Sequence, residues 1–496
     1  MSAAATQTSN TLDDGTGRLS KRAWGALLVL CGALFLDALD VSMVGVALPS
    51  IKTDLGLSTS SLQWAVSAYV LGYGGFLLLG GRAADLLGRR KVFLISLGVF
   101  VVASLLGGFA HDGNLLIATR FIKGMSAAFT APAGLSIITT SFAEGKARNK
   151  ALSVYTATGA TGFSLGLVIG GALTEAGWRW VFFLPAPVAL AVLIAGYKLV
   201  PTQEKLERKR GGFDVAGAVS ITGAMLLLVY TLVSAPTEGW TSARTLTSFA
   251  AAAALLVAFI VREQSTETPL VRLGILKSGS LVRANLGAMT LFGSWVGFQF
   301  IATLYLQQLR DWSALETGLA IFPGGVIVAV ISTRMVPLVM RFGITKLIVT
   351  GFVSLIAAYT LFLPIGLNSS YAAGMLPTVL LAGLGFALAF GPLTIAASSG
   401  VEAHEQGLAG GLLNTSFQFG GALMLAVTTA VINANTGASG TPQAILDGFH
   451  PGLYVPLGAS VLGIVAVGSG LVFRRQAVTA PEAELEPQME LELEAA

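Results

Sequence analysis

Four ionisable side chains lie inside stretches of sequence that are otherwise apolar. Asp37 and Asp40 are three residues apart in the first long apolar run, and Arg120 and Lys123 are three apart in a later one. In a helix, this spacing puts both members of each pair on one face. Charged groups are costly within lipid, so by default they mark a pathway for substrate or protons.

The two runs are expected to cross a membrane in opposite directions, which lets the pairs face each other. Counting the helical rise from each end puts Asp40 level with Arg120, and Asp37 deeper, level with Lys123, as a ladder of two ion pairs. A carboxylate beside a cation stays ionised, whereas one that loses its cation takes up a proton. We predict proton coupling here, with Asp40 as first candidate, Asp37 as second, and Arg120 as the tuning charge. A structural ion network that fixes helix register is the alternative.

The elements that position these charges follow from composition. Of the 496 residues, 54% are hydrophobic and 11% are charged, against roughly 25% charged in an ordinary soluble domain. An apolar exterior of this extent is suited to lipid, where helices satisfy their own backbone groups. The 60 glycines fit this reading because close helix packing in lipid favours small residues. The sequence predicts an all-α polytopic membrane protein.

Apolar windows of about 20 residues predict fourteen transmembrane helices. Six come first, two follow a charged linker, and six more follow: residues 24–48, 62–81, 92–110, 115–139, 151–174, 178–200, 213–235, 245–262, 282–308, 317–340, 345–366, 371–398, 407–433 and 451–473. The expected domains are a cytoplasmic leader, a six-helix bundle, a linker with two extra helices, a second six-helix bundle and an acidic disordered tail: residues 1–22, 23–200, 201–280, 281–475 and 476–496.

The basic residues predict the orientation. Most Lys and Arg fall in loops on the side of the N-terminus, whereas the opposite side receives Lys52, Arg179, Arg244 and Arg310. Cytoplasmic loops carry the excess of positive charge, so both termini are expected in the cytoplasm of a bacterial cell, with the protein in its inner membrane.

Three segments of the sequence carry motifs: LDALDVS at 36–42 followed by VALP at 46–49, GRAADLLGRRK at 81–91, and RFIKG at 120–124. They resemble signatures of the major facilitator superfamily, and specifically of its fourteen-span drug:proton antiporter family. The acidic position of the first signature falls on Asp40, and Asp37 is an addition. Lys123 stands where a glutamine is commoner. The resemblance covers nearly the whole chain and implies two six-helix bundles that rock around a central site.

The loop between the second and third spans matches the superfamily's cytoplasmic motif. Two glycines permit a tight turn, and an aspartate can pair with a basic group or a helix N-terminus to latch one conformation. Leu86 stands where a basic residue is usual. The expected latch residues are Gly81, Asp85, Gly88, Arg89 and Arg90.

The fifth span carries four glycines at the spacing of the antiporter motif: Gly162, Gly166, Gly170 and Gly171. Leu167 occupies the usual proline position of that motif, and leucine will not kink the helix as proline would. The glycines can also serve only as packing positions.

The resemblance implies that certain helices line a central cavity. Polar and aromatic residues on these helices are the candidates for contact with cargo: Tyr69, Tyr73, Tyr155, Trp295, Gln299, Asn414 and Gln418. Aromatic faces can hold flat apolar or cationic molecules. The interior of the second predicted bundle contains no acidic residue, which favours a monocationic or neutral cargo over a dication.

The resulting prediction is a secondary transporter that exports small lipophilic or cationic compounds in exchange for protons by alternating access. A proton-coupled importer on the same fold is the alternative, and an enzyme is disfavoured because no catalytic constellation or sizeable soluble domain is visible. The expected energy source is the proton gradient, without a cofactor, metal or nucleic acid, and the protein is expected to act as a monomer. The one cysteine, Cys31, and three histidines placed in predicted loops, His111, His404 and His450, offer no metal-binding spacing.

Overall fold

The chain folds into helices joined by turns and short connections over the residues that the computed structural model describes, namely 19–142, 146–201, 214–266, 273–399, 401, 406–437 and 441–477. Fourteen of the helical segments are long and apolar enough to cross a membrane, which confirms the predicted number. Residues 1–18 of the predicted leader, residues 202–213 of the predicted linker, His404 and nearly all of the predicted acidic tail lie outside the described residues.

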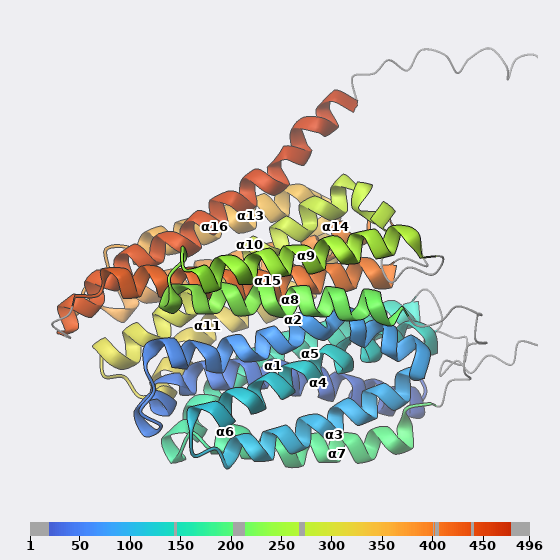
Figure 1. Cartoon of the computed structure of the whole chain (residues 1–496), viewed down its shortest axis with the longest axis horizontal. Helices are drawn as coiled ribbons and strands as arrows, with labels where there is room; N and C mark the ends of the chain where they lie inside the picture. The colour runs from blue at the N-terminus through green and yellow to red at the C-terminus, as the bar shows by residue number, and fades with distance from the viewer. Residues whose placement is uncertain are drawn as a thin grey trace, which may run out of the picture.

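The first six spans form one group of helices, drawn in blue and teal in Figure 1. Short loops connect them, and Asp112 caps α4 by accepting the backbone N–H of Leu115 at 2.9 Å. The elements are α1 (Lys21–Asp54), α2 (Thr59–Leu87), α3 (Arg89–Gly108), α4 (Gly113–Ser141), α5 (Lys146–Ala176), α6 (Trp180–Phe183) and α7 (Pro185–Leu199). The last two together make the sixth span.

The seventh and eighth spans are a helical pair, α8 (Val215–Glu238) and α9 (Ala243–Ser265). α8 packs on both α2 and α15 (Gln406–Asn435), so it contacts both halves of the molecule. α9 packs on α8 and exposes Val257 and Val261, each 59% accessible. An apolar face of this kind is suited to lipid.

The last six spans form the second group, which lies above the first in Figure 1. Its elements besides α15 are η1 (Leu273–Lys277), α10 (Gly279–Leu304), η2 (Tyr305–Leu309), α11 (Ala314–Thr333), α12 (Met335–Phe342), α13 (Ile344–Phe362), η3 (Tyr371–Met375), α14 (Leu376–Ser398) and α16 (Pro442–Ala477). η2 and η3 are single π-helical turns.

Two predicted spans need correction. The apolar run 317–340 is divided between α11 and the short α12, because apolar residues continue past the end of the spanning helix. The span predicted at 451–473 begins earlier, at Pro442, and contains Pro451 within the helix rather than at its start. His450 therefore lies in α16 and not in a loop, and its Nε2 contacts the Ile365 carbonyl at 2.8 Å.

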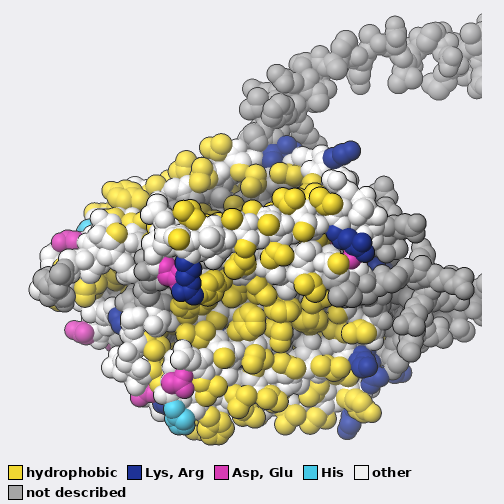
Figure 2. Space-filling model, in the orientation of Figure 1, with side chains coloured by type: hydrophobic (Ala, Val, Ile, Leu, Met, Phe, Trp, Pro, Cys, Tyr) yellow, Lys and Arg dark blue, Asp and Glu magenta, His cyan; other side chains and the backbone are white. Residues whose placement is uncertain are grey.

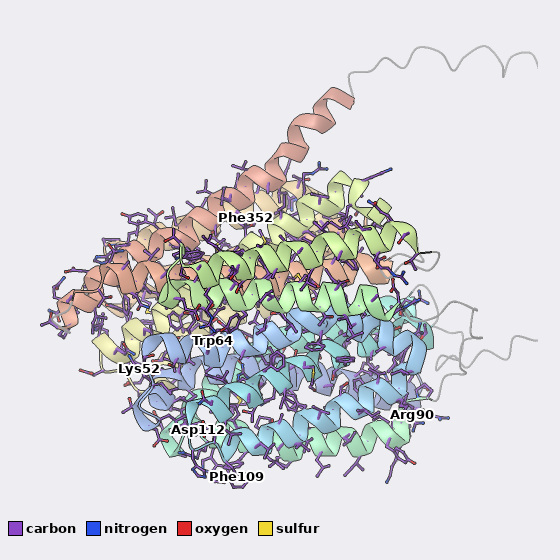
Figure 3. All side chains as sticks on the ribbon, viewed as in Figure 1. Lys52, Trp64, Arg90, Phe109, Asp112 and Phe352 are labelled. Carbon is purple, nitrogen blue, oxygen red and sulfur yellow. The ribbon has the colours of Figure 1, made fainter. Side chains whose placement is uncertain are left out.

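The two groups meet through α5 packed on α11 and α2 packed on α15. Near the end of the bundle that holds Lys52, the Gln307 amide donates to the Val46 carbonyl at 2.9 Å and so joins η2 to α1. Hydrophobic side chains cover the middle of the face shown in Figure 2, and charged side chains gather toward its two ends. Lys52 and Asp112 mark one end in Figure 3, and Arg90 marks the other.

Asp214 caps α8 at the edge of the apolar region. Its carboxylate accepts the backbone N–H of Gly217 at 2.9 Å, the Arg262 guanidinium at 3.2 Å and the Thr266 hydroxyl at 3.4 Å. The pKa of Asp214 lies below its usual value, first because of the hydrogen bond from the Gly217 N–H and then because of Arg262 and Thr266. Burial of the carboxylate acts in the opposite direction. A lowered pKa means that the cap stabilises the folded state above about pH 4 and that this contribution disappears as the pH falls through the folded-state pKa.

Asp214→Ala is therefore expected to reduce stability by about 1 kcal/mol near neutral pH, as the loss of a helix cap does. The difference from wild type should shrink on acidification, because the protonated cap contributes less. Thermal unfolding of the purified protein at neutral pH and near pH 3 measures both effects. Asp447→Ala, at an exposed position of α16, is the control. An equal deficit at both pH values would contradict the role assigned to Asp214.

Candidate functional site

A buried ion triad lies between α1 and α4. The Asp40 carboxylate accepts hydrogen bonds from the Arg120 guanidinium on one oxygen and from the Lys123 ammonium on the other. Asp40 and Lys123 are 0% accessible and Arg120 is 1% accessible. Arg120 also donates from Nε to the Ala65 carbonyl at 2.9 Å, which connects the triad to α2. One carboxylate thus holds two buried cations.

Aromatic rings surround the two cations of the triad. The Lys123 ammonium lies 4.7 Å from the centre of the Phe100 ring and 5.1 Å from that of Phe182. The Arg120 guanidinium lies 4.6 Å from the centre of the Tyr69 ring. Such contacts are worth about 0.5 to 2 kcal/mol each, more when desolvated. They partly replace the hydration that both cations lose on burial.

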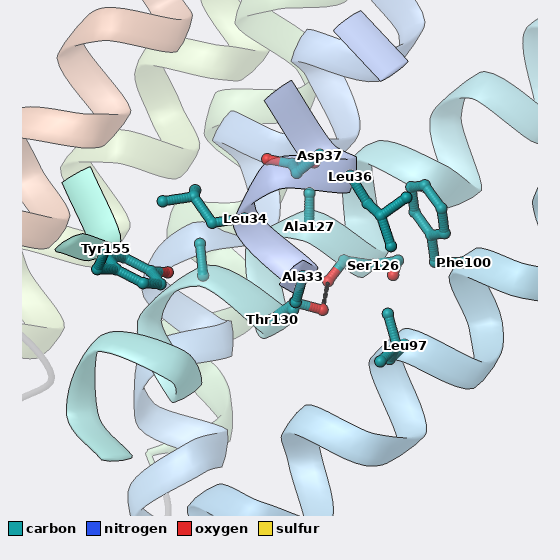
Figure 4. Close-up of a pocket in the computed structure, with 11 residues that line it drawn as sticks. Ala33, Leu34, Leu36, Asp37, Leu97, Phe100, Ser126, Ala127, Thr130 and Tyr155 are labelled. Carbon is teal, nitrogen blue, oxygen red and sulfur yellow. Dashed lines mark hydrogen bonds between the residues drawn. The ribbon is translucent and has the colours of Figure 1, made fainter. Parts of the chain in front are cut away.

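Asp37 has a different environment from Asp40. Its carboxylate accepts a hydrogen bond from the Tyr69 hydroxyl. It also lines a pocket formed by α1, α3, α4 and α5, which Figure 4 shows. The predicted ladder is therefore wrong in its second pair, because Lys123 bonds Asp40 while Tyr69 bonds Asp37. The difference arises from Tyr69 on α2, a helix that the two-helix prediction did not include.

Glycines on α2 and α4 allow the approach that positions Arg120 and Tyr69. A Cβ atom added to Gly124 would lie 1.9 Å from the Tyr69 carbonyl oxygen. One added to Gly72 would lie 2.3 Å from the Phe121 carbonyl oxygen. These distances are far below van der Waals contact, so the backbones of the two helices touch here because side chains are missing.

The four glycines predicted on α5 divide between two neighbours. A Cβ on Gly162, Gly166 or Gly170 would clash with α1, most severely at Gly166, where it would lie 2.1 Å from the Ser42 hydroxyl. A Cβ on Gly171 would clash with α11 of the second group, 2.6 Å from the Ala314 carbonyl. α5 therefore packs tightly against both halves.

The expected latch residues lie at the junction of α2 and α3. Gly88 joins the two helices with φ of 96°, a backbone conformation that favours glycine. Gly81 lies on α2 with Pro132 of α4 beside it. Arg90 donates to the Tyr197 carbonyl of α7 and stacks on its ring at 5.4 Å. Arg89 begins α3, and the Asp85 side chain is outside what the structure describes.

The seven predicted cargo residues do not gather in one place. Tyr69 and Tyr73 stack edge to face with ring centres 6.0 Å apart, and Tyr155 lines the Asp37 pocket. Gln299 on α10 lies beside Gly45 of α1, between the two halves. Asn414 donates to the Gly410 carbonyl at 3.0 Å within α15. The remaining two, described below, are Trp295 on α10 and Gln418 on α15.

A row of aromatic rings, missed in the sequence analysis, continues from Trp295. Ring centres are 6.4 Å apart between Phe163 of α5 and Trp295, and 4.9 Å between Trp295 and Phe386 of α14. Phe386 stacks on Phe390 at 5.3 Å, and Phe390 on Phe417 at 4.9 Å. The spacing of Phe386 and Phe390, four residues apart on one helical face, was the signal available in the sequence. Gln418 is adjacent to Phe417 and packs beside Gly74 of α2.

Residues 30–425 match the model of the Major Facilitator Superfamily. The chain belongs to this superfamily. Cephamycin export protein CmcT of Amycolatopsis lactamdurans is 35% identical to it over 91% of this chain and 93% of CmcT. Puromycin resistance protein pur8 of Streptomyces alboniger is 36% identical over 89% of each chain.

A solved structure of a peptide transporter, POT, in complex with sulfate has the same fold. Its TM-score is 0.67 at 16% identity, covering 91% of this chain and 95% of that one. The superfamily and these relatives make this major facilitator protein a multi-pass membrane transporter and not an enzyme. Its similarity to export and resistance proteins agrees with the predicted drug-efflux type.

No group of three or more His, Cys, Asp or Glu side chains that could hold a metal ion occurs among the described residues of this major facilitator protein. Charged groups inside a membrane protein mark, by default, a pathway for substrate or protons, and on that ground the buried triad and the Asp37 pocket are the candidate site.

Proposed function

We propose that this transporter exports small lipophilic or cationic compounds, antibiotics among them, from a bacterial cell in exchange for protons. The observation that carries the proposal is the Asp40 carboxylate, fully buried and bonded by both Arg120 and Lys123. The export and resistance functions in the names of CmcT and pur8 support the direction of transport.

Protonation of Asp40 provides the step that couples protons to movement. With the carboxylate ionised, two cations on α4 are held to α1. A proton on Asp40 removes that attraction and leaves Arg120 and Lys123 as neighbouring positive charges, which favours a different arrangement of α1 against α4. Arg120 passes the change to α2 through its bond to the Ala65 carbonyl. α2 and α5 contact the second group and transmit the movement to it.

The proposed setting is the bacterial cytoplasmic membrane, with both termini in the cytoplasm. The end of the bundle that holds Arg90 is then cytoplasmic, and the Gln307–Val46 contact lies near the outer surface. The transporter acts as a monomer, and the proton gradient is its only energy source.

Inside-out vesicles from bacterial cells that express the protein test the direction and the coupling. When the lumen is made acidic, an exporter accumulates a fluorescent lipophilic cation or a labelled neutral antibiotic in the lumen, and a protonophore abolishes the accumulation. Vesicles from cells without the protein are the control. Gradient-driven loss of cargo from the lumen would instead identify a proton-coupled importer, and transport that is insensitive to the protonophore would refute proton coupling.

A further inference from the structure

We infer that three polar side chains buried between the two halves determine how readily the transporter opens at its outer side. They are Gln63 and Ser67 of α2 and Thr429 of α15. Buried without hydrogen-bond partners, they raise the free energy of the closed arrangement relative to the outward-open one. The inference rests on the proposed function and deepens it, because export by alternating access passes through the outward-open state in every cycle.

The three side chains are almost completely inaccessible. Gln63 is 2% exposed, and Ser67 and Thr429 are 0% exposed. Among the residues that the structure describes, no hydrogen-bond partner reaches the Gln63 Nε2, the Ser67 Oγ or the Thr429 Oγ1. A polar group in this condition has lost its hydration without gaining a hydrogen bond in exchange. In an arrangement that admits water, the same groups are hydrated, so the closed arrangement is the one that they disfavour.

The positions of these residues place them on the contact between α2 and α15, which we call the α2–α15 seam (Figure 1). A Cβ atom added to Gly74 of α2 would lie 3.3 Å from the Gln418 Cβ of α15. The two helices are the second and thirteenth of the fourteen spans, so they run in opposite directions. Gln63 lies eleven residues before Gly74, and Thr429 lies eleven residues after Gln418. Eleven residues make about three helical turns, so Gln63 and Thr429 lie on facing sides at the same level.

Ser67 lies on the same face of α2, because it precedes Gly74 by seven residues, or about two helical turns. The side chains around it in the seam are apolar. Ala422 and Ala426 of α15 pack in one cluster with Val70 of α2. Alkyl groups of this kind offer no hydrogen bond, so the polar side chains of the seam have no substitute for water there.

The seam is closed toward the outer side in the proposed orientation. The Gln307 amide joins η2 to the Val46 carbonyl near that end. Further toward the cytoplasmic end, Asn414 is exposed on α15, and a Cβ atom added to Gly410 would meet no atom within 4 Å. The structure therefore has the arrangement in which the outer parts of α2 and α15 touch. Outward opening must break that contact, and the three unpartnered groups favour the break.

Thr428 is as deeply buried as Thr429 but has a different neighbour. It is 0% exposed, and its Oγ1 also lacks a hydrogen-bond partner within the described part of the chain. It faces α10, because a Cβ atom added to Gly297 would lie 2.9 Å from this Oγ1. The contact between α10 and α15 lies within one half and does not open as the halves separate. The two adjacent threonines therefore distinguish an effect on stability from an effect on opening.

A cysteine in place of Ala426 reports the opening of the seam. It is introduced together with Cys31→Ala, because Cys31 is the one cysteine of the chain. Ala426 is 0% exposed, so a membrane-impermeant methanethiosulfonate outside right-side-out vesicles can modify the Ala426→Cys variant only when the seam opens outward. The rate of modification therefore measures how readily the outer side opens.

Ser67→Ala and Thr429→Val each remove one unpartnered hydroxyl and should slow the modification about tenfold, the equivalent of relieving one buried unsatisfied group. Thr428→Val is the matched control and should leave the rate unchanged. All three substitutions should raise the Tm of the purified protein by about 1 °C or more, since each removes a buried unsatisfied group. Gln63→Leu combined with Ser67→Ala and Thr429→Val should abolish export in the inside-out vesicles while the Tm rises.

An unchanged modification rate in Ser67→Ala and Thr429→Val would overturn the inference. Equal slowing by Thr428→Val, or undiminished export by the triple variant, would overturn it as well. A lower Tm in the triple variant would contradict the assigned energetics and would identify a folding defect. The modification is measured without cargo or a proton gradient, so its result does not depend on the proposed function. The absence of gradient-driven export by wild type refutes that function and leaves the role of the seam standing.

Discussion

Replacing Asp40 with asparagine is expected to abolish proton-coupled transport and to destabilise the protein by about 3 to 5 kcal/mol, the usual cost of removing one partner from a buried ion pair. The cost arises because Arg120 and Lys123 would remain in the interior without the carboxylate that both of them bond. Thermal unfolding in detergent measures the loss of stability, and cargo accumulation in inside-out vesicles measures the loss of transport.

A second substitution separates folding from function. Asp40→Asn combined with Lys123→Gln removes one charge of each sign and leaves Arg120 with Asp37 as the remaining opposite charges. The double variant should recover most of the lost stability but not the transport, because the carboxylate that we propose couples protons to movement is still missing. Recovery of transport along with stability would show that Asp40 serves only the fold and would contradict its role in coupling.

Gly124→Ala is expected to destabilise the protein by about 2 kcal/mol or more and to impair transport strongly. A single methyl group there would lie 1.9 Å from the Tyr69 carbonyl oxygen, and overpacking of this kind typically costs about 1 to 3 kcal/mol, sometimes more. α2 and α4 would have to separate next to Lys123, which would also disturb the bonds of Arg120 and Tyr69. Thermal unfolding and vesicle transport measure the two effects.

Gly458→Ala is the matched control for Gly124→Ala. It places the same methyl group on α16, where nothing lies within 4 Å of it. Alanine favours a helix over glycine by roughly 0.5 to 1 kcal/mol, so this variant should be as stable as wild type or slightly more so. Equal behaviour of the two variants would contradict the close approach of α2 and α4.

Most of the fold could be predicted from the lengths of the apolar runs in the sequence. The number of spans was predictable because a lipid-crossing helix needs a nearly unbroken run of apolar residues. The ends were less predictable where that signal is ambiguous. In the run 317–340 only Arg334 marked the end of α11 at Thr333, because apolar residues continue beyond it from Met335 to Met340. The last span was predicted to begin at residue 451, but the helix starts at Pro442 and passes through Pro451.

The candidate site was predictable in its members and not in its pairings. Helical spacing identified four candidate residues, and in the structure all four lie between α1 and α4: Asp37, Asp40, Arg120 and Lys123. Which carboxylate pairs with the cations depends on a third helix, because the Tyr69 hydroxyl on α2 donates a hydrogen bond to Asp37. The contacts of Lys123 with Phe100 and Phe182 are tertiary as well. Spacing along one chain segment contains no information about such neighbours.

The single carboxylate that holds both buried cations has an energetic consequence for export. If one proton enters through Asp40 for each monovalent cation that leaves, no net charge crosses the membrane in a full cycle. The membrane potential, worth about 2.3 kcal/mol per charge per 100 mV, then contributes nothing, and the pH difference alone sets the limit of accumulation. A neutral cargo exchanged for the same proton would move one charge inward per cycle. Its export would draw on the voltage as well and would continue when the two sides have equal pH.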